Sequence, residues 1–384
     1  MIAVFAAAHK RDPEPAPPGG RPLARLPRRA RSRPAPVNAP PQSLLQYPYA
    51  DPPAPGEATE VAPGLVWIRM PLPFALDHIN LWLAREPDGR WTAIDSGYGN
   101  DTTRGLWEGH FATTLSNAPI ARVVATHYHP DHLGNAAWLA KRFGAPVSMT
   151  QAEFLTAHAV IDQRAAHALA DSCALFMAHG LEREQVDALV ARGNAYARGV
   201  PEAPRVIDRM IAGEAVRFGG RDWSVIPGYG HSPEHASLYA PSAGVLISGD
   251  MLLPRISTNV SVWPVEPEGD PLGRFLASLA SFERLPGDTL VLPSHGMPFR
   301  SVAARVAELR AHHAARLAEL EEALADARAP RSAGDLVPVL FRRPLDLQQR
   351  FFATGEAIAH LNHLWRTGRA TRTVGDDGAV RFSA

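Results

Sequence analysis

The sequence predicts an α+β fold with a helical insertion and a small C-terminal module, and three observations support this prediction. Between about 62 and 300, short apolar runs that predict strands alternate with amphipathic runs that predict helices. Residues about 151–200 interrupt this alternation with helical patterns alone. After about 300, three helical patterns precede a β-hairpin. We therefore expect a main domain over 51–301 and a module over 302–384.

The first 50 residues do not predict a folded segment. They are rich in proline and arginine and contain few apolar side chains to bury, so we expect a disordered extension over 1–50. The apolar stretch 1–8 precedes the positive charges, which is the reverse of their order in a secretory signal. A basic docking tail is the alternative, but arginines scattered among prolines favour a dispensable extension.

The remaining elements follow in order along the chain. Before the insertion we predict strands at 65–70, 79–83 and 91–95, a helix at 105–115, a strand at 121–125, a helix at 131–143 and a strand at 147–149. In the insertion we predict helices within 151–179 and over 182–197. After it we predict a hairpin at 215–226, strands at 237–240 and 244–248, a loop at 251–271, a helix at 272–285 and a strand at 289–292. The module has predicted helices at 302–327, 333–341 and 345–366, and a hairpin at 371–382.

A cluster of histidines follows the predicted strand 121–125, at the sheet edge where α/β folds place their chemistry. In an extended segment, side chains two residues apart point the same way, so His127 and His129 can bind one ion. Pro130 bends the chain, and Asp131 and His132 then form a second group. Imidazole and carboxylate ligands suit zinc, and two adjacent groups suggest two adjacent metals.

Further segments that contain aspartate or histidine occur along the chain. They end strands or occupy loops at 94–97, 230–235, 246–250 and 292–296. Together with 127–132, these blocks resemble, in order, the signature of the metallo-β-lactamase superfamily. The resemblance implies an αββα sandwich that carries the helical insertion and a C-terminal module of winged-helix type.

The resemblance also implies a role for each residue of the site. His127, His129 and His231 would hold one metal, and Asp131, His132 and His295 the other. Asp250 would bridge the two ions, because two close cations need a carboxylate between them. Asp131 and Asp250 are therefore the predicted catalytic residues. Asp95 and His235 would support the ligands by hydrogen bonds.

Two Zn²⁺ ions are the expected cofactors. Flavodiiron proteins of the superfamily have glutamate at the position of His129, so histidine here favours zinc. A mononuclear iron sulfur dioxygenase keeps the same histidines and remains the alternative as an oxidoreductase.

By resemblance, the expected activity is hydrolysis of a small ester, thioester or lactone by a metal-bridging hydroxide. The sequence does not separate these three substrate classes. True β-lactamases of the superfamily lack the bridging aspartate, so Asp250 argues against antibiotic hydrolysis. An endoribonuclease is a further alternative, although it would require a basic surface.

Two segments are expected to border the substrate. The insertion lies between two metal-binding blocks and should cap the site as a lid. Tyr229, Arg255 and Asn259 are the candidate substrate contacts, and a packed surface loop is the competing interpretation for the last two. The insertion's His158 and His167 lie on opposite helix faces, so we do not expect them to join the ligands.

Composition limits the partners. Lys+Arg and Asp+Glu both number 39 in the 384 residues, which argues against a nucleic-acid partner. No apolar run of about 18 residues predicts a membrane span. A single cysteine, Cys173, fits a reducing compartment, so we expect a cytoplasmic protein. We expect the C-terminal module to pack on the main domain or to mediate a homodimer.

Overall fold

The computed structural model describes residues 44–384, so most of the extension predicted over 1–50 lies outside the described residues. Residues 44–50 belong to the folded chain. Leu45 is buried in a core shared with the C-terminal helices, and the Arg300 amide donates a hydrogen bond of 2.9 Å to the carbonyl of Gln46. The predicted boundary at 50 is therefore several residues too late, because these contacts are with residues far along the chain.

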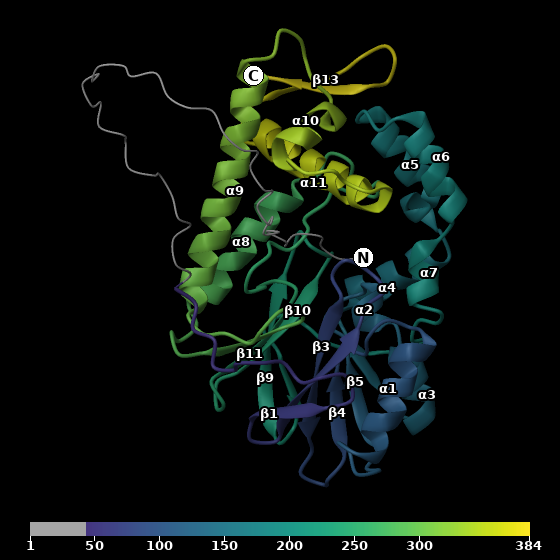
Figure 1. The fold of residues 1–384 in the computed structure, drawn as a ribbon, viewed down its shortest axis with the longest axis vertical. Coiled ribbons are helices and arrows are strands. Elements are labelled where there is room, and N and C mark those ends of the chain that lie inside the picture. Colours follow the sequence, from purple (N-terminus) through teal and green to yellow (C-terminus); the bar gives the residue numbers. More distant parts are fainter. Residues whose placement is uncertain (1–43) are drawn as a thin grey trace, which may run out of the picture.

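Two sheets form the centre of the molecule (Figure 1). The first contains, in spatial order, β1 (Ala58–Ala62), β2 (Leu65–Pro71), β3 (His78–Arg85), β4 (Trp91–Ile94), β5 (Ile120–Val124), β6 (Val147–Met149) and β7 (Asp208–Arg209). The second contains β12 (Leu290–Pro293), β11 (Val245–Gly249), β10 (His235–Ala240), β9 (Arg221–Gly228) and β8 (Ala215–Phe218). The short edge strands β1 and β7 were not predicted from the sequence.

Both faces of the second sheet are buried. In β11, Val245 and Ile247 belong to the core between the two sheets, whereas Leu246 belongs to the core under the helices. The alternation follows from the strand geometry, in which successive side chains point to opposite faces. An uninterrupted apolar strand is the sequence signature of such a doubly covered sheet.

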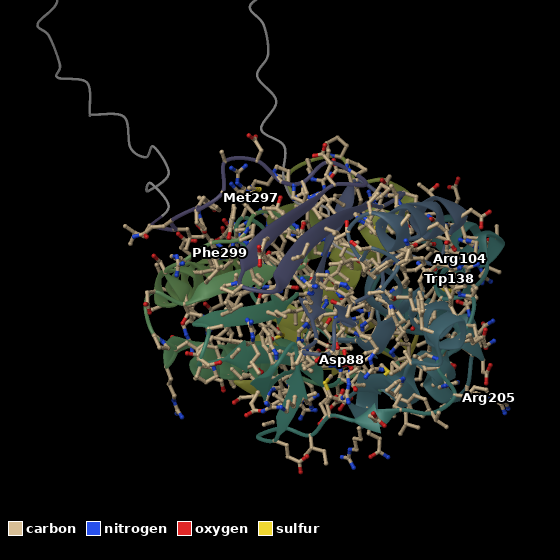
Figure 2. The ribbon with its side chains drawn as sticks, turned by 90° about the horizontal axis from the view of Figure 1, so that it is seen from below. Asp88, Arg104, Trp138, Arg205, Met297 and Phe299 are labelled. Atoms are coloured by element: carbon tan, nitrogen blue, oxygen red, sulfur yellow. The ribbon has the colours of Figure 1, made fainter. Side chains whose placement is uncertain are left out.

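Helices cover the outer faces of the sheets and complete the predicted αββα sandwich. On the first sheet lie α1 (Asp101–Ala112), α2 (Pro130–Leu133) and α3 (Ala136–Phe143), and on the second lies α8 (Pro271–Glu283). The α1 helix begins four residues before its predicted start, because Asn100 caps it by accepting a hydrogen bond from the Thr103 amide. Arg104 of α1 lies 5.7 Å from the ring of Trp138 in α3, and Figure 2 shows the two side by side.

The insertion is helical, as predicted, with more breaks than the sequence suggested. It contains α4 (Gln151–Ile161), a 3-10 turn (Ala165–His167), α5 (Leu169–Ala178), α6 (Arg183–Arg192) and α7 (Ala195–Gly199). The single helix predicted over 182–197 is two helices. Gly193 takes a positive φ of 63° and Asn194 caps α7, so the chain turns between them.

The C-terminal module packs on the main domain. It consists of α9 (Val302–Ala325), α10 (Ala333–Leu340), α11 (Leu347–Arg366) and a hairpin of β13 (Thr371–Val374) and β14 (Val380–Ser383). Its apolar side chains share one core with α8 and with the outer face of the second sheet. The likeness to a winged helix stays a prediction. Within residues 44–384, no helix combines the length and the apolar character that a membrane span requires.

The shared core predicts that the module and the main domain unfold together. Phe382 is fully buried in that core, so Phe382→Ala should lower the free energy of unfolding by about 3–5 kcal/mol. Val374 of the same hairpin is 59% exposed, and Val374→Ala should stay within about 0.5 kcal/mol of the wild type. Chemical denaturation followed by circular dichroism measures both. A separate early transition for Phe382→Ala, with the main transition unmoved, would contradict the shared core.

Candidate metal centre

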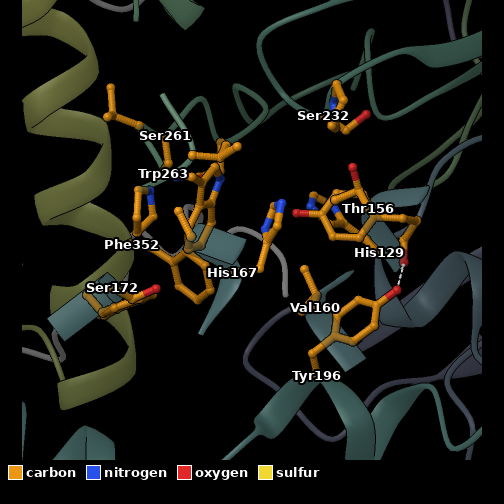
Figure 3. A pocket seen from close by; sticks show the side chains of 18 of the residues that line it. His129, Thr156, Val160, His167, Ser172, Tyr196, Ser232, Ser261, Trp263 and Phe352 are labelled. Carbon is orange, nitrogen blue, oxygen red and sulfur yellow. Dashed lines mark hydrogen bonds between the residues drawn. The ribbon is translucent and has the colours of Figure 1, made fainter. Parts of the chain in front are cut away.

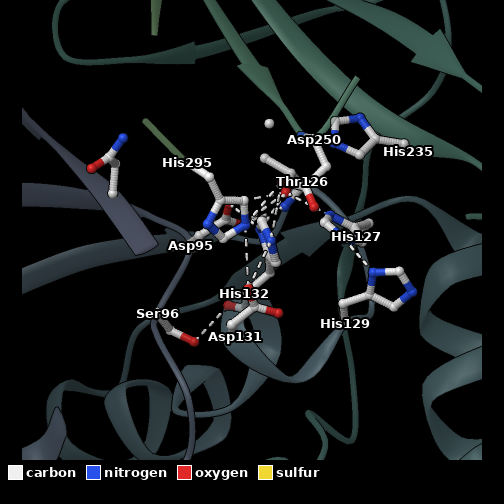
Figure 4. A network of polar contacts seen from close by, with 12 residues as sticks. Asp95, Ser96, Thr126, His127, His129, Asp131, His132, His235, Asp250 and His295 are labelled. Carbon is white, nitrogen blue, oxygen red and sulfur yellow. Dashed lines mark hydrogen bonds and ion pairs between the residues drawn. The ribbon is translucent and has the colours of Figure 1, made fainter. Parts of the chain in front are cut away.

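Strand ends of both sheets meet at one edge of the sandwich. Asp95 follows β4, His127 follows β5, Asp250 follows β11 and His295 follows β12. Because β4 and β5 are parallel, as are β11 and β12, their carboxyl ends lie at the same edge. The loop between β9 and β10 adds His231. Figure 4 shows the resulting cluster of imidazoles and carboxylates.

The structure brings the predicted ligands into two adjoining groups. One group consists of His127, His129, His231 and Asp250, and the other of Asp131, His132 and His295. Within each group, one potential ligand atom per residue lies within 4.8 Å of the others, and every member is buried. All seven residues are those predicted from the sequence as metal ligands.

In the first group, the ring nitrogens converge on one point. His127 Nε2 lies 2.9 Å from His129 Nδ1 and 3.3 Å from His231 Nε2. His231 Nε2 is also 3.3 Å from Asp250 Oδ2. Ligands at ~2.0–2.1 Å around a tetrahedral zinc would be ~3.3–3.4 Å apart. The two separations of 3.3 Å match this value, and the His127–His129 separation of 2.9 Å is shorter.

In the second group, the carboxylate of Asp131 faces two imidazoles. Asp131 Oδ2 lies 3.6 Å from His132 Nε2 and 3.5 Å from His295 Nε2. The other oxygen of Asp250, Oδ1, is 3.5 Å from His132 Nε2 and 3.4 Å from His295 Nε2. Asp250 therefore directs one oxygen toward each group.

Several buried atoms of the cluster have no hydrogen-bond partner within residues 44–384. They are both oxygens of Asp131, both oxygens of Asp250, and Nε2 of His132 and of His295. Buried polar atoms without partners are rare in native proteins, because each forfeits its hydration. Carboxylate oxygens and imidazole nitrogens that converge on one point are a donor set for divalent cations. The residues therefore fit a pair of metal ions.

Hydrogen bonds on the far side of each ring fix which nitrogen faces the cluster. His231 Nδ1 donates to the carbonyl of Asn259 at 2.7 Å, and His295 Nδ1 donates to the carbonyl of His78 at 2.8 Å. A carbonyl only accepts, so these rings carry hydrogen on Nδ1 and leave the lone pair of Nε2 for an ion. His132 Nδ1 is held in the same way, 2.7 Å from Asp95 Oδ2.

Asp95, for which the sequence predicted a supporting role, is hydrogen-bonded to residues of the cluster. Besides His132, its carboxylate accepts hydrogen bonds from the amide of Thr126, at 2.8 Å, and from the Thr126 hydroxyl. Asp95 adopts a φ of 60°, in the left-handed region that residues other than glycine rarely occupy. Such strain occurs where the surroundings hold a functional side chain in place.

Burial and the neighbouring charges shift the pKa values of the residues in the cluster. Burial lowers the pKa of His127 and of His129 well below the usual value, so both rings are neutral, as a ligand must be. Burial also acts to lower the pKa of His132, but three nearby carboxylates outweigh it and raise that pKa to about 9. Burial opposes ionisation of Asp250, yet His295 and His132 hold its pKa well below the usual range. The acidic cluster thus attracts positive charge.

His235 lies beside the cluster, as the sequence predicted for a supporting residue. Its Nε2 accepts a hydrogen bond of 3.1 Å from the amide of Asp250, which fixes the start of the loop after β11. Burial lowers the pKa of His235 to about 3, so the ring stays neutral and can accept this bond. A Cβ at Gly249 would collide with the same ring, so only glycine fits there.

Sequence reasoning missed Glu153, a fully buried carboxylate in the first turn of α4. It accepts hydrogen bonds from the amide of Tyr128 at 2.9 Å, the hydroxyl of Ser232 at 2.7 Å and the amide of Glu234 at 2.6 Å. Glu153 therefore joins the loop of His127 and His129 to the loop of His231. A single glutamate in a helical pattern carries no motif that could have revealed this role.

A cavity of about 550 Å³ opens beside the cluster (Figure 3). His129 and His231 line it at the metal side, and the insertion forms much of its wall, as expected of a lid. Two of the predicted substrate contacts, Tyr229 and Asn259, also line this cavity. Arg255 does not: it lines a smaller cavity of about 190 Å³ between the loop after β11 and the C-terminal module. The predicted substrate contact at Arg255 is therefore not part of this cavity, because residues 255–257 of the loop face the C-terminal module and only the residues from Asn259 onward reach the larger cavity.

Comparison with known families identifies two matching regions. The model described as "Metallo-beta-lactamase superfamily" matches residues 75–295. A second model, "Metallo-beta-lactamase-like, C-terminal domain", matches residues 317–384. The first match spans all of the residues that form the two groups.

Similar proteins include two solved structures. A beta-lactamase domain protein from Burkholderia ambifaria is 48% identical, with a TM-score of 0.82 over 88% of this chain and 98% of that chain. A metallo-beta-lactamase family protein from Thermus thermophilus is 31% identical, with a TM-score of 0.71 over 84% of this chain and 99% of that chain. The probable metallo-hydrolase YqjP of Bacillus subtilis is 26% identical over 254 residues, which cover 63% of this chain and 74% of that protein.

The position of Glu153 predicts an effect on metal affinity. Glu153→Gln keeps the shape but turns an amide NH₂ group toward donors, so zinc affinity should fall by about 10–100-fold. Glu214 is exposed, and Glu214→Gln should bind zinc as the wild type does. Equilibrium dialysis with metal analysis measures both. Unchanged affinity in Glu153→Gln would show that the bonds of Glu153 do not position the ligands.

Proposed function

Because the chain belongs to the metallo-β-lactamase superfamily, we propose that it is a di-zinc hydrolase of a small ester, thioester or lactone. One observation carries this proposal: the carboxylates of Asp131 and Asp250 are buried, have no hydrogen-bond partner in the described part of the chain and face histidine nitrogens. A lone metal would leave the ligands of the other group uncompensated. Two divalent cations compensate both groups.

Each cation would have its own ligands. His127, His129 and His231 would hold the first, and Asp131, His132 and His295 the second. Asp250 would lie between them, with one oxygen toward each group. When bound, such a pair lowers the pKa of a shared water to about 7 and polarises the carbonyl under attack.

The residues of the chain supply position and shielding. Hydrogen bonds to Asp95, Asn259 and the His78 carbonyl keep three ligand rings oriented before any substrate arrives. The insertion and the loop that contains Asn259 enclose the adjoining cavity, which limits access of bulk water. Tyr229 lines the same cavity near His231 and could contact the substrate there. The single cysteine, Cys173, is buried in α5 and belongs to a different core, so it is no candidate nucleophile.

The surroundings favour a small molecule over RNA. An endoribonuclease would need unpaired cationic side chains along its groove to bind phosphates. The cavity at the metal centre instead has mostly apolar walls, and its Arg274 is paired with Glu266. The formal net charge of the chain is zero. A homodimer and a cytoplasmic location remain predictions.

Zinc is the metal that the ligand set favours. Five of the seven residues are histidines, and a ligand set rich in imidazole suits zinc better than a set made mostly of oxygen atoms would. An iron oxygenase is the alternative from a different reaction class. Metal analysis of protein purified from cells distinguishes the two.

The proposal predicts how ligand variants behave. His127→Ala should abolish binding at the first group and reduce hydrolysis by several orders of magnitude, because the metals generate the nucleophile. Asp250→Ala should lose at least one ion, since in the described residues no other carboxylate of the two groups faces both of them. His158 bonds the Pro204 carbonyl away from the centre, so His158→Ala is the matched control with full activity.

Metal content and initial rates on a panel of ester, thioester and lactone substrates measure these effects. The proposal fails if Asp250→Ala keeps two metals and full activity. It also fails if the wild type holds a single iron and consumes oxygen.

A further inference from the structure

We propose, building on the hydrolase function above, that the substrate carries an uncharged apolar tail that reaches from the metal centre to the C-terminal module. The cavity beside the metal centre would hold this tail, with the hydrolysable carbonyl at its inner end. Phe351, Phe352 and Trp263 would then select substrates by the length of the tail.

The cavity has two ends of different chemistry. His129 and His231 line one end, and Phe351 and Phe352 of α11 line the other. Figure 3 shows Trp263 and Phe352 on the side away from His129, with Val160 and His167 between them. A volume of about 550 Å³ is within the range of sites that bury a drug-sized ligand. A substrate no larger than an acetyl ester would leave most of it unfilled.

Three separate parts of the chain supply the apolar wall. The insertion contributes Val160, Leu169 and Leu189, and the loop after β11 contributes Val262 and Trp263. The C-terminal module contributes the two phenylalanines. The rings of Trp263 and Phe351 lie 5.9 Å apart, and those of Phe351 and Phe352 lie 5.8 Å apart, so they form one aromatic surface.

Polar side chains in the wall are largely bonded to the protein itself. Ser232 donates to Glu153, and Asn194 donates to the carbonyls of Val160 and Ile161. Arg274 is paired with Glu266. A charged tail would lose its hydration and would find these side chains already bonded, whereas an apolar tail gains from burial against the mostly apolar wall.

The C-terminal module is held firmly enough to act as a wall. The amide of Val262 donates to the carbonyl of Gly355 in α11 at 3.2 Å. A Cβ at Gly355 would lie 2.9 Å from the Ser261 hydroxyl, so the helix and the loop approach closely at this point. At the next residue of α11, Glu356 accepts a hydrogen bond of 3.1 Å from the side chain of Asn259. The phenylalanines therefore have a fixed position relative to His231.

The reaction on such a substrate is hydrolysis at the inner end. The oxygen of water bonds to the carbonyl carbon and the bond to the alkoxy or thiol group breaks. The departing group takes one proton, and the acid product keeps the other as its acidic hydrogen. The apolar tail belongs either to the acyl part or to the leaving group, and both arrangements place it in the same cavity.

The test is a pair of substrate series on zinc-loaded protein. One series lengthens the acyl group from acetyl to dodecanoyl on a constant thiol, and the other lengthens the leaving alcohol on a constant acetyl group. In the series that lengthens the group held by the cavity, kcat/KM should rise about fourfold with each added CH₂ until the cavity is filled. Phe352→Ala should lower kcat/KM for the octanoyl or octyl member about 10-fold and leave the acetyl or methyl member unchanged. Val160→Phe should move the optimum to shorter chains, because it fills part of the cavity.

The matched control is Phe143→Ala. Phe143 is partly buried, as Phe352 is, but it packs on Phe111 away from the cavity, so its variant should keep the wild-type length profile. Calorimetric titration with octanoate and acetate separates this inference from the hydrolase proposal. Suppose that no substrate is hydrolysed, but that octanoate binds more tightly than acetate and that Phe352→Ala weakens the binding of octanoate. Only the hydrolase proposal then fails. The inference is overturned if kcat/KM does not change with chain length in either series and the two acids bind equally. It is also overturned if Phe352→Ala lowers kcat/KM equally for short and long substrates.

Discussion

The buried carboxylates of Asp131 and Asp250 impose the constraint on which the rest of the structure depends. Taking an ionised carboxylate out of water costs several kcal/mol unless it is compensated, and among residues 44–384 the oxygens of both residues have no hydrogen-bond partner. Of the histidines around them, His127 and His129 offer neutral ring nitrogens, whereas the carboxylates raise the pKa of His132 to about 9. A divalent cation in each group would compensate the carboxylates and accept the lone pairs of the nitrogens. A sheet edge can hold such a cluster because parallel strands deliver several side chains to one place.

Bonds from distant parts of the chain hold the cluster in shape. Glu153 of the insertion joins the two histidine loops, and Asp95 orients His132. The carbonyl of Asn259 orients His231, while its side chain donates to Glu356 of the C-terminal module. Glu356 is itself buried, and this burial raises its pKa to about 7. The insertion and the module thus support the metal centre as well as enclosing the cavity beside it.

The sequence predicted what depends on local spacing, and it missed what depends on long-range contacts. Histidines two residues apart after an apolar strand, together with blocks that resemble a known superfamily, were enough to identify all seven clustered residues. Glu153 carries no such pattern, since its three partners lie in other segments. The sequence also did not reveal which cavity Arg255 lines, because the path of a loop depends on the residues it packs against. The break between α6 and α7 depends on the positive φ of Gly193, which helix propensity alone does not reveal.

The presence of two metal ions is the central claim, and anomalous diffraction from crystals of the zinc-loaded protein tests it most directly. Data collected on both sides of the zinc absorption edge should show two peaks of similar height, about 3.5–4 Å apart. One peak should lie among His127, His129 and His231, the other among Asp131, His132 and His295, with Asp250 between them. A single peak, or peaks away from these residues, would contradict the account.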